Sequence, residues 1–302
     1  MSVRPVKQVI QPRPTLEGAG VRLQRGFGFG STNEFDPFLL FDDFRNERPA
    51  DYLAGFPWHP HRGIETITYV LAGSVDHGDS LGNEGTLGAG DVQWMTAGSG
   101  ILHQEMPHGD AQGRMHGFQL WANLPSSLKM TAPRYQDVPS KEIPEIVDDD
   151  GTLVRVITGD FWGKKGPVDG TAADPRYLDV FVPPGKRKSL PVEVGRHAFA
   201  YVFEGSGAFS GASQPFGVLT EKETAAGEAL VRESTGNRSL VVFDAGDEVT
   251  VQAGDEGIRF LLVSGKPIEE PVAWHGPIVM NTQAELQQAV TELRNGTFIK
   301  HG

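Results

Sequence analysis

Short apolar runs recur along the chain between clusters of Gly, Pro and Asp. They are rich in β-branched and aromatic side chains, which is typical of β-strands rather than of helices. We predict strands at 64–71, 92–95, 116–124, 153–158, 177–182, 199–203, 240–243 and 258–263. Many short strands separated by turn residues favour an all-β fold built as a sandwich or a barrel.

One stretch near the C-terminus has a helical pattern instead. In TQAELQQAVTELRNG, Thr282 stands three residues before Glu285, the spacing of a capping box, and apolar residues then recur at helical spacing from Leu286 to Leu293. Gly296 follows as a stop signal. We therefore predict a helix over 282–294 that packs on the protein as a C-terminal cover.

Two short motifs occur twice in the same order. YVLAGS at 69–74 returns as YVFEGS at 201–206, and AGDVQWMTAG at 89–98 returns as AGDEVTVQAG at 245–254. Repeated motifs in a matched order indicate two copies of one β unit. The polar, acidic segment DVPSKEIPEIVDDDG lies between them and suits a connector. We predict two domains, 1–135 and 150–302, which agrees with a length of 302 residues.

Charge and composition exclude several classes of function. Lys and Arg number 27 against 39 Asp and Glu, and the formal net charge of −12 repels phosphate backbones and anionic bilayers. We expect no direct nucleic-acid binding and no membrane association. The N-terminus lacks an apolar leader, and no apolar run is long enough to span a bilayer, so we expect a cytoplasmic protein. With no Cys in the chain, any metal must be held by His, Asp or Glu.

Two pairs of residues carry candidate chemistry. His59 and His61 flank a proline in PWHPHRG, and His103 and Glu105 flank a glutamine in GILHQEM. Alternate side chains of an extended segment share one face, so each pair can converge on one point. A His-x-His motif alone often arises by chance, but two such pairs supply three neutral nitrogens and one carboxylate. That set suits a divalent first-row metal with coordination positions left open.

The internal repeat offers a comparison within the same chain. If the four residues were needed for the fold, the second copy should retain some of them. At the positions aligned by the two motifs, the second copy has Pro191, Glu193, Arg259 and Leu261. We therefore interpret His59, His61, His103 and Glu105 as a site confined to the first domain, and the second domain as a copy without metal.

At these residues the sequence resembles the pirin family of two-domain cupins. The resemblance rests on GFPWHPHRGIETITYVLAGSVDHGDSLGN at 55–83, GTLGAGDVQWMTAGSGILHQEMP at 85–107, FQLWANLP at 118–125, and GPIVMNT and RNGTF near the C-terminus. It implies two tandem cupin β-barrels with a short C-terminal helix. It also implies that His59, His61, His103 and Glu105 hold one metal per chain, usually iron as Fe(II), although Mn, Co, Ni, Cu or Zn also suit this ligand set.

The resemblance further implies a function. Some pirin relatives are quercetin 2,3-dioxygenases, which open a flavonol ring with O2 and release carbon monoxide. A metal with open positions suits that oxidoreductase chemistry, and Glu105 would act as the catalytic base that accepts the flavonol hydroxyl proton. Under this interpretation the protein is a monomer that binds a small aromatic substrate and O2.

Two alternatives remain open at this stage. Other pirins act as iron-dependent regulators through protein partners, so this chain could be a non-catalytic, redox-responsive regulator of transcription or of a metabolic enzyme. It could also bind a metal and act on a small molecule that is not a flavonol. The net charge is compatible with both alternatives, because it opposes DNA contact but not contact with a protein.

Overall fold

The structure, a computed structural model, describes residues 2–210 and 235–301, which form two compact units. The N-terminal unit consists of Arg13–Glu142 and the residues from Ile268 onward, and the C-terminal unit consists of the residues up to Pro12 and Ile143–Pro267. The units differ from the predicted continuous domains, 1–135 and 150–302, because each end of the chain belongs to the unit formed by the other half of the sequence. Among the described residues, no helix is both long and apolar enough to cross a membrane.

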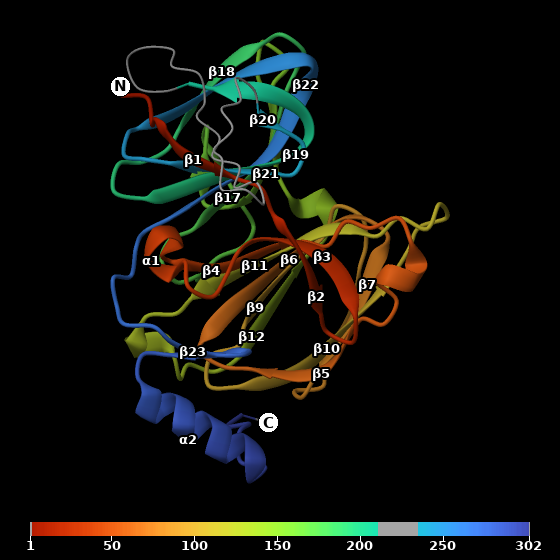
Figure 1. Ribbon diagram of the computed structural model, residues 1–302, viewed down its shortest axis with the longest axis vertical. Helices are drawn as coiled ribbons and strands as arrows, with labels where there is room; N and C mark the ends of the chain where they lie inside the picture. Colours follow the sequence, from red (N-terminus) through yellow and green to blue (C-terminus); the bar gives the residue numbers. More distant parts are fainter. Residues whose placement is uncertain (1, 211–234, 302) are drawn as a thin grey trace, which may run out of the picture. The chain divides into compact units, whose positions relative to one another are not determined.

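The N-terminal unit contains a seven-stranded antiparallel sheet in the order β12-β9-β6-β11-β4-β3-β2 and a four-stranded sheet in the order β5-β10-β7-β8. Figure 1 shows these strands in red to yellow-green. The strands are β2 Arg13–Glu17, β3 Val21–Phe27, β4 Phe38–Asp43, β5 Phe56–His61, β6 Ile64–Ala72, β7 Ser74–Asp79, β8 Glu84–Leu87, β9 Val92–Thr96, β10 Ile101–His108, β11 His116–Asn123, β12 Arg134–Val138, β23 Ala273–His275 and β24 Ile278–Met280. The helices are α1 Thr32–Phe35, α2 Gln283–Arg294 and the 3-10 turns Pro49–Asp51, Ser126–Leu128 and Ser140–Glu142.

The C-terminal unit repeats this arrangement. Its main sheet has the order β1-β21-β19-β22-β17-β14-β13, with β18 paired to β22 and β20 paired to β19. The strands are β1 Val6–Ile10, β13 Glu145–Val147, β14 Leu153–Thr158, β15 Asp160–Phe161, β16 Lys164–Lys165, β17 Arg176–Val182, β18 Arg187–Pro191, β19 His197–Phe209, β20 Thr235–Gly236, β21 Ser239–Phe243 and β22 Glu248–Gly265. The prediction of an all-β chain with one short C-terminal helix is confirmed.

The strand pairing corrects one of the two repeat alignments. Tyr69 and Tyr201 occupy matching places in β6 and β19, as the first motif predicts. The second motif is shifted by one strand, because its first copy leads into β9 whereas its second copy leads into β22. By position in the sheet, the counterpart of β9 is β21. The first half of β22 corresponds instead to β10, because it pairs with β18 as β10 pairs with β5. Gly-Asp turns precede many strands, so a match that consists mainly of such turns does not determine strand identity.

The corrected alignment changes which residues stand opposite the predicted ligands. Read along the paired strands, the four positions in the C-terminal unit are Leu190, Val192, Val249 and Val251. All four are buried in one apolar cluster that forms the core of that unit. The second copy therefore fills with packed hydrocarbon the positions where the first copy has imidazoles and a carboxylate.

Strand pairing explains why the chain ends change units. β1 pairs with β21 at the edge of the C-terminal sheet, where β12 pairs with β9 in the N-terminal sheet, and Figure 1 shows the red β1 beside β21. In the C-terminal unit this edge position is filled by β1, which precedes the rest of that unit in the sequence. In the N-terminal unit it is filled by β12, which follows most of the strands of that unit. A sequence pattern that predicts a strand does not predict which sheet edge it will join.

The last segment of the chain is anchored to the strand that carries His59 and His61. Helix α2 begins at the predicted capping box, in which Thr282 and Glu285 bond each other's backbone N–H. Arg62 is 2% exposed and donates to the Glu292 carboxylate at 2.7 Å and to the Ser99 and Phe298 carbonyls. Gly63, with φ at +77°, permits a close approach, because an added Cβ there would lie 2.0 Å from the Val279 carbonyl oxygen.

This anchor predicts a loss of stability in acid. Burial by itself would raise the pKa of Glu292, but hydrogen bonds from Gln288, Arg62 and Lys300 outweigh it and lower the pKa from 4.5 to about 2. Because the pKa of Glu292 is lower in the folded state than in the unfolded state, the carboxylate stabilises the folded state at pH values above the unfolded pKa. This contribution disappears as pH falls from about 5 to 2. We expect the free energy of unfolding of wild type to exceed that of Glu292→Gln at pH 6 and the gap to close toward pH 3, measured by urea titration. The exposed control Glu256→Gln should show no such gap, and a constant gap at all pH values would contradict the prediction.

Candidate metal centre

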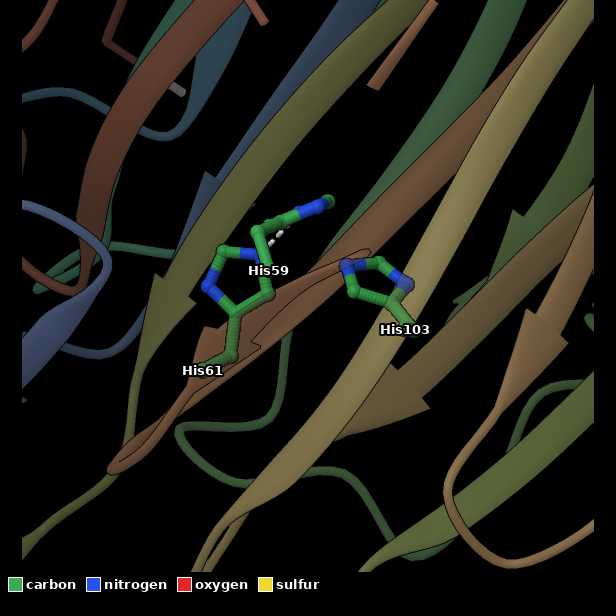
Figure 2. A group of neighbouring side chains, drawn as sticks. All are labelled: His59, His61 and His103. Atoms are coloured by element: carbon green, nitrogen blue, oxygen red, sulfur yellow. Dashed lines mark hydrogen bonds between the residues drawn. The ribbon is translucent and has the colours of Figure 1, made fainter. Parts of the chain in front are cut away.

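Neighbouring strands bring three histidines together. In the β5–β10 ladder His59 lies opposite His103 and His61 lies opposite Ile101. Each of His59, His61 and His103 offers one ring nitrogen, and these nitrogens all lie within 4.8 Å of one another. Figure 2 shows the three imidazoles gathered around one point. Among the described residues, this is the one group of three or more such side chains close enough to hold a metal ion.

Backbone carbonyls determine which nitrogens of two rings face the group. His59 Nδ1 lies 2.9 Å from the Pro57 carbonyl oxygen, and His61 Nδ1 lies 3.2 Å from the Pro277 carbonyl oxygen. A carbonyl can only accept, so both Nδ1 atoms carry hydrogen, and in the neutral rings both Nε2 atoms present lone pairs. These two Nε2 atoms are 3.1 Å apart. Two lone pairs at that distance repel each other, and a bound cation would relieve the repulsion.

His103 is the most deeply buried member of the group. Its side chain is 1% exposed, and neither ring nitrogen has a hydrogen-bond partner among the described residues. Buried nitrogens without partners are costly unless something else binds them. Burial lowers the pKa of both His61 and His103 well below the ordinary value, so both rings are neutral, as metal ligation requires. The donor set therefore fits a divalent metal.

Glu105 lies near the group without being part of it. It follows His103 by two residues on β10 and is half-buried, and its Oε1 lies 3.0 Å from Thr68 Oγ1. Burial raises the pKa of the Glu105 carboxyl, while His59 and the Thr68 hydroxyl oppose that rise. Three of the four predicted ligands thus meet at one point, and the role of Glu105 as a fourth ligand stays a prediction.

A cavity of about 710 Å³ opens beside these residues, within the N-terminal unit. His59, His61 and Glu105 line it together with mainly apolar and aromatic side chains, including Phe44, Trp121 and Trp274. Its volume falls in the range of small-molecule sites, which combine apolar walls with a few oriented polar groups. The cavity can therefore take an aromatic molecule of several rings next to the histidines.

Sequence reasoning missed three contributors to this cavity. Trp274 and Pro277 belong to the C-terminal segment, and Pro277 also orients His61 through its carbonyl. Thr68 and Gln119 also line the cavity, with Thr68 Oγ1 2.9 Å from Gln119 Oε1. The third contributor is an ion pair on β3 and β4. A polar residue at an inward position of an otherwise apolar strand is the signal that could have found Thr68 and Gln119.

The ion pair consists of Arg25 and Asp42. Arg25 Nε and Nη2 donate to the two oxygens of Asp42 at 2.8 and 2.7 Å, and Arg25 Nη1 lies 2.8 Å from Glu17. Burial raises the pKa of Asp42 to about 6, although the Arg25 hydrogen bonds oppose the rise. The pKa of the guanidinium is also raised, because the attraction of the two carboxylates outweighs its burial.

Comparison with known proteins identifies relatives that span the whole chain. Residues 20–122 match the family model described as Pirin, and residues 177–299 match the model of the Pirin C-terminal cupin domain. A pirin-like protein of Caulobacter vibrioides is 44% identical over 99% of this chain and 100% of its own length, and human Pirin is 40% identical over 97% of this chain and 93% of its own length.

A solved structure has the same fold over nearly the whole chain. It is a quercetin 2,3-dioxygenase from Acinetobacter baumannii, 31% identical, with a TM-score of 0.83 over 98% of both chains. The prediction of two cupin domains is confirmed by these matches. This chain belongs to the pirin family.

Proposed function

We propose that this protein is a metal-dependent dioxygenase that opens the ring of a flavonol such as quercetin with O2 and releases carbon monoxide. The observation that carries the proposal is the position of the three-histidine group and Glu105 at the wall of one largely apolar cavity. The similarity to the Acinetobacter enzyme supports it.

His59, His61 and His103 would hold the metal, with Glu105 as the expected fourth ligand. We propose Fe(II) as the native ion, with Mn, Co, Ni, Cu and Zn as other ions that this donor set accepts. When bound, the metal would supply Lewis acidity toward the flavonol oxygen and access to O2 chemistry. The carbonyls of Pro57 and Pro277 keep the two Nε2 atoms free of hydrogen and directed at the site.

Glu105 would serve as the base that accepts the enolic hydroxyl proton of the flavonol. It lines the cavity, and Thr68 Oγ1 lies within hydrogen-bond distance of its carboxylate, which limits the positions that the carboxylate can adopt. A bound flavonol between the largely apolar walls would displace water from around the carboxylate.

Replacing Glu105 by alanine is expected to lower turnover by about 100-fold or more, because general bases typically contribute that much. Flavonol affinity should fall much less, since the rest of the cavity lining is unchanged. Rapid kinetics with metal-loaded protein and anaerobic binding of quercetin would measure the two effects separately. Equal losses of turnover and affinity, or unchanged turnover, would argue against this role for Glu105.

The function itself is tested by reconstitution. The anaerobic protein is loaded with Fe(II) or another divalent metal, quercetin and O2 are added, and flavonol absorbance is followed together with carbon monoxide. We expect absorbance loss with release of about one carbon monoxide per flavonol, as the dioxygenase stoichiometry requires. Bound metal without turnover for any ion would overturn the dioxygenase proposal.

A regulatory function is the second candidate, and one exposed side chain favours it. Trp58 lies on β5 directly before His59 and is 53% exposed. Exposed aromatic residues are enriched at protein-binding sites. A change in the metal could therefore reach a protein partner through this strand. Metal-dependent partner binding that is lost in Trp58→Ala, in a protein without turnover, would support this function.

A further inference from the structure

A row of polar side chains crosses the main sheet of the N-terminal unit. Its members are direct cross-strand partners, one from each of six neighbouring strands, so they share one face of the sheet. In strand order β3, β4, β11, β6, β9 and β12 they are Arg25, Asp42, Gln119, Thr68, Gln93 and Asp137. Hydrogen bonds join Arg25 to Asp42 and Gln93 to Asp137, and Thr68 Oγ1 lies 2.9 Å from Gln119 Oε1. We call these six residues the polar row.

The corresponding positions in the C-terminal unit hold apolar residues. Its sheet has the matching strand order, and the row that contains Ala200, the counterpart of Thr68, is apolar throughout. In matching order its members are Val156, Leu178, Leu262, Ala200, Val241 and Val9. All six are buried in the core cluster of that unit. The fold therefore does not require polar residues at these positions.

Four members of the polar row line the cavity: Arg25, Asp42, Gln119 and Thr68. Thr68 stands at the end near Glu105, and Arg25 lies three strands away. Neighbouring strands are about 4.8 Å apart, so this part of the row spans about 14 Å. That length fits an aromatic molecule of two or three rings with a hydrogen-bonding group at each end.

Within residues 2–210 and 235–301, the far end of the row has hydrogen-bonding capacity that no partner uses. The Arg25 guanidinium has five N–H groups, of which three are directed at Asp42 and Glu17. Each Asp42 oxygen accepts one bond from Arg25 and has a second lone pair. A phenolic hydroxyl can both donate to a carboxylate and accept from a guanidinium, so it matches this pair. A ligand carboxylate would instead meet Asp42 and Glu17 against a single Arg25.

We propose that the polar row is a substrate-recognition surface, and that the Arg25–Asp42 pair selects aromatic substrates with hydroxyl groups on a ring remote from the reacting oxygen. The inference deepens the proposed function and rests on it for the orientation of the substrate. It predicts a preference for neutral polyhydroxylated ring systems over unsubstituted and carboxylated ones.

The test converts the pair to its apolar counterpart in the other barrel. Arg25→Val with Asp42→Leu installs the residues found at Val156 and Leu178, and replacing a whole ion pair by hydrocarbon avoids an unpaired buried charge. Anaerobic binding to metal-loaded protein is measured by fluorescence for quercetin and for two analogues, one without hydroxyls on the phenyl ring and one without hydroxyls on the fused ring. Wild type should bind quercetin at least about 10-fold more tightly than one of the analogues, the usual effect of a hydrogen bond to a charged group. The double variant should reduce that ratio to about one.

A matched pair in the other unit provides the control. Arg259 and Asp179 form the same two-bond ion pair, with side chains 27% and 1% exposed against 26% and 6% for Arg25 and Asp42. Their replacement by leucines should leave the binding ratio unchanged. Metal stoichiometry reports whether the metal-binding unit of each variant is folded, and Asp42→Asn, a milder change, should lower the same ratio.

Two results would overturn the inference: no discrimination by wild type between quercetin and either analogue, or an unchanged ratio in the double variant and in Asp42→Asn. Because binding is measured without O2, the outcome does not depend on turnover. Discrimination that requires the pair in a protein without carbon monoxide release would overturn the proposed function and keep the recognition surface. Flavonol turnover without discrimination between quercetin and the analogues would keep the proposed function and overturn the recognition surface.

Discussion

Replacing His103 by alanine is expected to abolish metal binding and, with it, flavonol turnover. His103 is the most deeply buried member of the three-histidine group, and neither of its nitrogens has another partner among the residues that the structure describes. Outer-shell changes alone weaken metal affinity by about 10- to 100-fold, so loss of a ligand should exceed about 100-fold. Metal content after dialysis, together with a chelator-competition titration, measures the effect.

The control for this prediction is another histidine of the same strand. His108 lies at the end of β10, is exposed and pairs with Asp76, so His108→Ala should retain metal and activity. Removal of His103 also opens a space in a buried site, and the unfolding temperature of the metal-free proteins separates that effect from ligand loss. A His103→Ala protein that keeps one tightly bound metal per chain would refute the assignment of this residue as a ligand.

The second large effect is expected for Arg62→Met, which removes the anchor of the C-terminal segment. The guanidinium donates to the Glu292 carboxylate and to two carbonyls, and it lies 4.1 Å from the ring centroid of Phe298. Breaking a buried ion pair from one side costs about 3 to 5 kcal/mol, and because Glu292 keeps its contacts with Gln288 and Lys300 we place this change at about 3 kcal/mol. We expect a loss of that size in the free energy of unfolding, measured with urea. Metal affinity should also fall, because the same segment provides the Pro277 carbonyl that orients His61.

An exposed ion pair provides the comparison. Arg48 pairs with Asp51 while its side chain is 74% exposed, and Arg48→Met should cost at most about 1 kcal/mol. Relative to wild type, hydrogen exchange in Arg62→Met should increase more in α2 and β24 than in β6, because Arg62 anchors the segment that contains α2 and β24. An Arg62→Met protein as stable as wild type would show that hydrophobic packing of Leu286 and Ala289 alone holds the segment.

Local patterns were sufficient for the parts of the site that lie within one strand. Alternation of side chains along β5 and β10 predicts the pairs His59/His61 and His103/Glu105 without knowledge of either partner strand. The capping box at Thr282 likewise depends on residues only three positions apart, and the structure forms it as predicted. Patterns of this kind succeed because the interacting groups are a few residues apart.

The sequence patterns did not predict features that depend on matching segments far apart in the chain. The Gly-Asp motif aligned β9 with β22, because a turn motif describes the local backbone and not the neighbouring strand. The exchange of the chain ends between the two units was missed for the same reason, since an edge strand can pair with any open edge of suitable register.

The sequence by itself determined the all-β character of this protein, its C-terminal helix, its duplication and the two residue pairs that supply the candidate ligands. Only the tertiary structure decided that His59 lies opposite His103, that the Pro277 carbonyl orients His61, and that the polar row forms one continuous surface. The physical reason is separation along the chain: Arg25 and Asp42 are 17 residues apart and Thr68 and Gln119 are 51 apart. Contacts over such separations depend on the register and packing of whole sheets, which no local pattern encodes.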